Sequence, residues 1–168
     1  MEHRVNNQNG LQFILAGDSY MTFRNNKTGN RYTYHVKKSK EHDMHFVSVM
    51  YGKDNNSQYL YVGIIASNLF RLTKGSKMDE SDVRFKVFAY VFKRLLRGSL
   101  PLNIEIWHEG KCGRCGRKLT VPESIETGIG PECALRMGIV MPKTMRKQGI
   151  KNTGNPVVMK QGELFNQN

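Results

Sequence analysis

Three cysteines and a histidine in one short segment constrain this chain more than any other feature. Cys112 and Cys115 are separated by two residues, and Cys133 follows after seventeen more. Two thiolates separated by two residues can bind one metal ion. Gly116, which follows Cys115, can adopt the tight turn that such a site requires. Three cysteines cannot pair completely into disulfides. The spacing therefore predicts a metal site, with zinc as the expected ion.

A tetrahedral zinc site needs a fourth ligand. His108 is the nearest candidate in sequence, so we expect one structural Zn²⁺ held by His108, Cys112, Cys115 and Cys133. The alternatives for the fourth position are a water molecule or one of His3, His35, His42 and His45. A site with an open position would suit catalysis, and a lone Cys-x-x-Cys pair would suit thiol–disulfide exchange. No acidic residue is clearly poised as a base, and the third cysteine favours a metal turn.

The segment from Leu11 to Ile65 has the composition of β-strands. Residues 20–23 and 32–36 are rich in aromatic and β-branched side chains, and residues 25–30 between them carry turn chemistry. Two further strands are expected over 45–51 and 59–65, joined by a polar run. These segments predict a four-stranded antiparallel β-meander.

An amphipathic helix is expected over residues 81–97. Apolar residues recur there at helical spacing, Asp82 lies among candidate N-cap residues, and Gly98 follows as a C-terminal cap. Its apolar face can cover one face of the meander, which a lone sheet cannot bury. Pro101 then marks an exit, and 103–107 predicts a short strand that leads into the metal segment. The expected fold class is α+β.

The metal segment resembles a small uncharacterised zinc-ribbon domain common in bacteriophage proteins. The resemblance covers residues 107–134 and rests on five runs: His-Glu-Gly at 108–110, Cys-Gly-Arg-Cys-Gly-Arg at 112–117, Leu-Thr at 119–120, Pro-Glu-Ser-Ile at 122–125 and Gly-Ile-Gly-Pro-Glu-Cys at 128–133. It implies a phage or prophage origin and supports His108 as the fourth ligand. It implies no biochemical activity.

The chain divides by composition into three parts. Residues 1–106 are expected to form the α+β body, residues 107–138 a zinc ribbon or treble-clef-like finger, and residues 139–168 a flexible basic tail. The sequence contains neither a run of apolar residues long enough to span a membrane nor the apolar block of a secretory signal, so we expect a cytoplasmic protein.

The formal net charge of +12 indicates a polyanionic partner, and nucleic acid is the expected one. Four cations crowd the first two cysteines and are the predicted phosphate contacts: Lys111, Arg114, Arg117 and Lys118. Tyrosines 32, 34, 59 and 61 alternate along the predicted strands, where exposed rings could stack on bases and buried rings would pack in the core. The predicted function is a nucleic-acid-binding replication or transcription accessory factor.

A second hypothesis is a protein-interaction module or inhibitor that targets a host or phage machine. The tail sequence Gln161-Gly162-Glu163-Leu164-Phe165 resembles the Gln-x-x-Leu-Phe peptide that docks on the replication sliding clamp, which would make Gln161, Leu164 and Phe165 partner-binding residues. Catalysis has little support, because the chain lacks a glycine-rich phosphate loop and a His-Glu-x-x-His motif. We therefore do not expect an enzyme.

Overall fold

The computed structural model describes residues 3–52 and 58–141. Its helical elements are the 3₁₀ turn Asn7–Asn9, α1 (Gly10–Ile14), α2 (Val83–Leu96), α3 (Pro122–Thr127) and α4 (Pro131–Arg136). Its strands are β1 (Asp18–Asn25), β2 (Arg31–Lys38), β3 (Met44–Met50), β4 (Tyr59–Ala66), β5 (Leu69–Arg71) and β6 (Ile104–His108). Mixed α+β architecture is confirmed.

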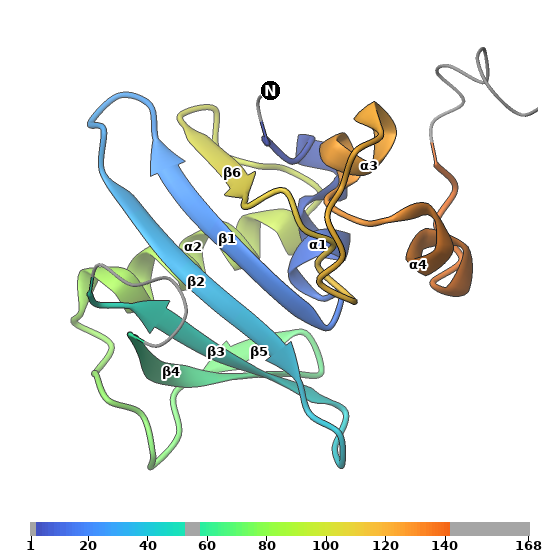
Figure 1. Ribbon diagram of the computed structural model, residues 1–168. Coiled ribbons are helices and arrows are strands. Elements are labelled where there is room, and N and C mark those ends of the chain that lie inside the picture. The colour runs from blue at the N-terminus through green and yellow to red at the C-terminus, as the bar shows by residue number, and fades with distance from the viewer. Residues whose placement is uncertain (1–2, 53–57, 142–168) are drawn as a thin grey trace, which may run out of the picture.

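The strands form one curled antiparallel sheet in the order β5-β4-β3-β2-β1-β6 (Figure 1). The predicted meander is its centre, but the expectation of four strands is wrong. The short β5 extends it beyond β4, and the strand predicted over 103–107 returns from α2 to pair with β1. That pairing places His108 opposite Met21 and Trp107 opposite Thr22, so the chain enters the cysteine segment directly from the sheet edge.

Helix α2 confirms the predicted amphipathic helix. The Asp82 side chain accepts a hydrogen bond from the Arg84 backbone N–H, and Gly98 beyond the helix has a positive φ of 75°. The Tyr34 hydroxyl on β2 donates to the Arg84 carbonyl at 2.7 Å, which ties the helix to the sheet. Nowhere in the described ranges is a helix long and apolar enough to cross a membrane.

Strands were expected from Leu11 onward, but the chain begins with α1 in this region. Phe13 and Ile14 of α1 are fully buried, because the helix turns both side chains toward the core. This five-residue helix is too short for a periodicity of 3.6 to be distinguished from alternation. It packs next to α2 and β1, on the same side of the sheet as α2.

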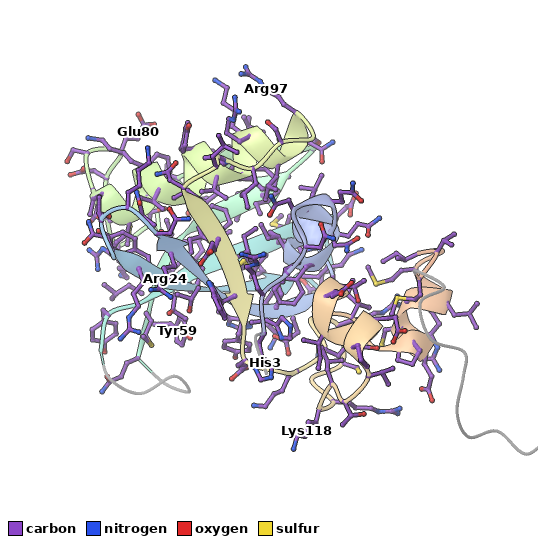
Figure 2. The ribbon with its side chains drawn as sticks, turned by 90° about the horizontal axis from the view of Figure 1, so that it is seen from above. His3, Arg24, Tyr59, Glu80, Arg97 and Lys118 are labelled. Atoms are coloured by element: carbon purple, nitrogen blue, oxygen red, sulfur yellow. The ribbon has the colours of Figure 1, made fainter. Side chains whose placement is uncertain are left out.

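The two faces of the sheet differ. One face, covered by α2 and α1, carries the buried residues of alternate strand positions, such as Met21, Phe23, Tyr34 and Val36. The other face, which we call the open face, carries no helix among the described elements (Figure 1). Figure 2 shows Arg24 and Tyr59 on the side of the sheet away from α2 and Arg97. The open face presents Tyr20, Thr22, Arg24, Arg31, Thr33, His35, Tyr59, Tyr61 and Trp107.

Replacing Phe88 with alanine is expected to reduce the free energy of unfolding by about 3–5 kcal/mol, because it leaves a large cavity at the centre of the core. Phe88 is fully buried, and its ring lies 4.7 Å from that of Phe70 and 5.0 Å from that of Tyr34, measured between centroids. Tyr90→Ala on the same helix is the matched control. Tyr90 is 55% exposed, so its removal should cost within about 0.5 kcal/mol. Equal losses for both variants in urea denaturation would contradict this assignment of the core.

Candidate metal centre

Cys112 and Cys115 lie on a tight knuckle. An isolated antiparallel bridge pairs Lys111 with Lys118, and the Cys112 backbone N–H donates to the Arg117 carbonyl at 2.8 Å. The Gly116 N–H donates back to the Cys112 carbonyl at 2.9 Å, and Gly116 has a φ of 74°. The glycine predicted for the turn is therefore confirmed by the backbone conformation it adopts.

The third cysteine arrives on α4. Pro131 occupies the first turn of that helix, as predicted, and Cys133 follows two residues later. The sulfur atoms of Cys112, Cys115 and Cys133 all lie within 4.8 Å of one another, and none forms a disulfide. Sulfur atoms on a tetrahedral ion with bonds near 2.3 Å would be about 3.8 Å apart. Small adjustments of the side chains would thus bring all three onto one ion.

The electrostatics of the three thiols suit a cation. Burial raises the pKa of Cys112, but backbone N–H groups of Gly130, Cys115 and Arg114 outweigh burial and bring its pKa below the ordinary value. Burial and the two neighbouring sulfur atoms raise the pKa of Cys133 to about 12. Three thiolates this close repel one another unless a cation sits between them. The group can therefore hold a metal ion.

His108, the predicted fourth ligand, does not join this group. Its Nε2 donates to the Ile125 carbonyl at 2.7 Å, and its Nδ1 accepts from the Gly110 backbone N–H at 2.9 Å. Burial lowers the pKa of His108, which favours the neutral ring that this pair of bonds requires. In this arrangement neither ring nitrogen is available to a metal, and the histidine instead fixes the entry to the knuckle.

The alternative histidines also lie elsewhere in the described chain. The His3 ring stacks on His108 at a centroid distance of 5.3 Å, His35 pairs with Asp18, and His45 contacts the Leu15 carbonyl. His42 is exposed at the turn before β3. Among the described residues, the metal-binding group therefore consists of the three cysteines.

The finger does not match the predicted zinc ribbon exactly. Over residues 107–138 its only β-pairing beyond β6 is the isolated bridge of the knuckle, and two short helices, α3 and α4, make up much of the rest. Its buried residues Leu119, Ile125, Ile129 and Ala134 belong to the same hydrophobic cluster as the body. The finger and the body therefore share one core.

The structure separates the four predicted phosphate contacts into two kinds. Arg117 forms a salt bridge of 2.9 Å with Glu132, and Lys111 lies 3.7 Å from Glu109. Arg114 and Lys118 are exposed and form no salt bridge with any described residue. The predicted partner-binding residues Gln161, Leu164 and Phe165 lie outside the described ranges.

The four tyrosines considered for base stacking lie on opposite faces of the sheet. Tyr34 is buried in the core and Tyr32 packs against it, whereas Tyr59 and Tyr61 lie on the open face. Tyr59 lies beside Tyr20 and His35 and shares a pocket with Trp107. The sequence pattern did not single out these three neighbours. Successive side chains of a strand point to opposite faces, so buried Met21 and Val36 could have placed Tyr20 and His35 on the other face. The position of Trp107 on this face follows only from the pairing of β6 with β1, which the sequence did not predict.

Residues 107–138 match the model of a family of unknown function, DUF6011. The likeness of the cysteine segment to an uncharacterised family is thus confirmed for this part of the chain. No curated protein and no solved structure matches the chain.

Replacing Cys115 with serine is expected to abolish stoichiometric metal binding, because two thiolates remain of the three that converge. Cys115 is exposed, so the change itself removes little packing. Metal content after dialysis against trace zinc, measured by atomic emission, provides the readout. Arg114→Ser, one residue away and outside the group, should retain the metal. A Cys115→Ser protein that keeps one ion per chain would contradict the site.

Proposed function

We propose that this protein binds nucleic acid, with its metal-held finger contacting phosphate. The observation that carries the proposal is that Arg114 and Lys118 on the knuckle are exposed and form no salt bridge with another described residue. Cations without carboxylate partners are available to neutralise phosphates and release counterions. The net charge of +12 supports the same partner.

The proposed ion is Zn²⁺, since clustered thiolates at tetrahedral spacing favour it among common divalent metals. The three sulfur atoms line a pocket of about 260 Å³ together with Arg117, Glu132 and Ser124. We propose that a water molecule supplies the fourth ligand. The ion has a structural role here: it fixes the turn from which Arg114 projects.

The biological role proposed is that of an accessory factor in replication or transcription. A phage origin and a cytoplasmic location stay predictions, as does the absence of enzymatic activity. The sliding-clamp peptide at 161–165 also stays a prediction, and no described contact favours it over nucleic acid binding.

The double variant Arg114→Gln/Lys118→Gln is expected to weaken nucleic acid binding and to reduce its salt dependence. Loss of two phosphate contacts should make the negative slope of log K against log salt shallower by about 1.4–1.8. Anisotropy of a labelled oligonucleotide across a salt series measures both quantities.

The matched control is Lys93→Gln/Arg97→Gln, which removes the same charge from exposed positions at the end of α2. That variant should keep the slope, since α2 lies behind the sheet (Figure 2). If both double variants change the slope equally, the charge acts only as a diffuse field. If the unmodified protein does not bind at low salt, the proposed function is wrong.

A further inference from the structure

Two arginines face each other on the open face without a carboxylate between them. Arg24 on β1 and Arg31 on β2 are directly opposite in the strand register, and both are exposed. Like charges at such positions destabilise a sheet. Neither guanidinium forms a salt bridge within the described ranges. The pair thus favours an anion bound from outside.

The carboxylates of this face already have partners. Glu105, next to Arg24 across β6, accepts from Arg4 at 3.2 Å and from the Trp107 indole N–H at 3.1 Å. Asp18 accepts from the His35 ring at 2.6 Å, and Glu109 lies near Lys111. Among the residues that the structure describes, the charge left unpaired on the open face is therefore positive.

Aromatic rings lie two to four residues along the strands from the arginines. Tyr20 and His35 stack with centroids 3.9 Å apart and an interplanar angle of 6°. Tyr59 meets both rings edge-on, at 5.9 and 6.0 Å. Burial, with Asp18 and Glu109 nearby, raises the pKa of Tyr20, so its phenol stays neutral and adds no charge.

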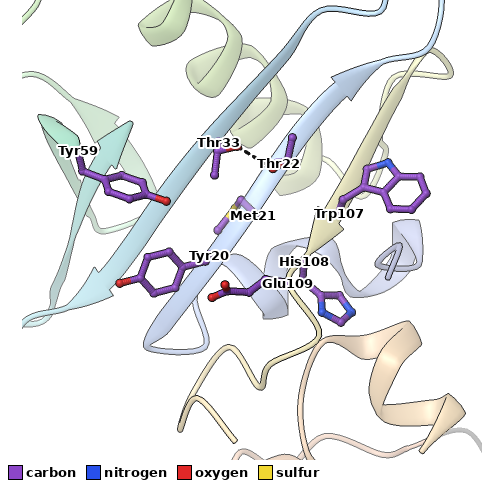
Figure 3. A pocket seen from close by; sticks show the side chains of 8 residues that line it. All are labelled: Tyr20, Met21, Thr22, Thr33, Tyr59, Trp107, His108 and Glu109. Carbon is purple, nitrogen blue, oxygen red and sulfur yellow. Dashed lines mark hydrogen bonds between the residues drawn. The ribbon is translucent and has the colours of Figure 1, made fainter. Parts of the chain in front are cut away.

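A pocket of about 110 Å³ opens beside these rings (Figure 3). Tyr59 borders it from β4 and Trp107 from β6, and the hydrogen-bonded pair Thr22 and Thr33 lies between them. A second pocket, of about 210 Å³, shares Tyr20 and Glu109 with the first. It continues to Lys111, Cys112 and Gly116 of the knuckle. The two hollows therefore connect the open face with the finger.

We propose that the open face is a binding site for single-stranded nucleic acid. Phosphates contact Arg24 and Arg31, bases stack on the exposed parts of Trp107 and Tyr59, and the strand continues past Tyr20 to the knuckle. This inference rests on the proposed function and adds the substrate class. Stacking on protein rings needs bases that are not already paired and stacked in a duplex, and it tolerates any base sequence.

The single tryptophan of the chain makes the site directly observable. Titration of oligothymidine or oligouridine into the zinc-loaded protein should quench Trp107 fluorescence, with the same midpoint as anisotropy of the labelled strand. A duplex of equal length should compete at least tenfold less well, on the order expected from one stacked base.

Tyr59→Leu removes one stacking ring and is expected to weaken single-strand binding by about 5- to 100-fold with an unchanged salt slope. Tyr90→Leu on α2 makes the same chemical change on the far side of the sheet and should leave affinity unchanged. Arg24→Gln should instead make the negative salt slope shallower by about 0.7, the value for one phosphate contact on a single strand. Thermal unfolding of each variant identifies any loss caused by misfolding.

The outcomes separate the two proposals. Binding seen by anisotropy without Trp107 quenching, and with Tyr59→Leu equal to Tyr90→Leu, would overturn this site and leave the finger as the binder. Preference for duplex would overturn it as well. Binding of an extended peptide, with no binding of oligonucleotide by either readout, would overturn the proposed function together with this inference.

Discussion

The ring of Phe13 holds the finger against the body, and the arrangement of both candidate surfaces depends on this contact. Phe13 is 1% exposed and lies against His108, with ring centroids 5.7 Å apart. Gly113 of the knuckle and Gly128 after α3 both approach the same ring so closely that a Cβ on either would overlap it. Backbone bonds strengthen the joint: Gly113 N–H donates to the Gly128 carbonyl, and Asp18 N–H to the Gly113 carbonyl. A side chain at either glycine would push the finger away from β1.

This joint relates the cysteines to the sheet. Because Asp18 begins β1 and bonds to the knuckle, the metal centre lies at the end of the strand that carries Tyr20, Thr22 and Arg24. Figure 2 shows Lys118 of the finger on the same side of the molecule as Arg24 and Tyr59. A metal ion held by the three cysteines would therefore do more than hold a local turn. It would fix a basic knuckle beside an aromatic sheet face, the two surfaces along which we propose that one strand of nucleic acid binds.

The sequence predicted the parts better than their connections. The helix over 81–97 and the central strands were predicted correctly because their apolar patterns extend over many residues. The capping residues of the helix are also adjacent to it in sequence. The cysteine group also followed from spacing alone. The edge strands and α1 were missed or left unplaced, since short elements depend on tertiary pairing. His108 was chosen as the fourth ligand for its nearness to the knuckle in sequence, but the backbone groups of Gly110 and of the distant Ile125 occupy both ring nitrogens.

The most direct test of a continuous path is ultraviolet cross-linking of oligothymidine to the zinc-loaded protein, followed by mass spectrometry of the cross-linked peptides. The account predicts that one short strand cross-links both to a ring of the open face, Tyr59 or Trp107, and to the knuckle between Lys111 and Lys118. Removal of zinc with a chelator should eliminate the knuckle cross-links first. Cross-links confined to the knuckle, or spread over α2, would contradict the path.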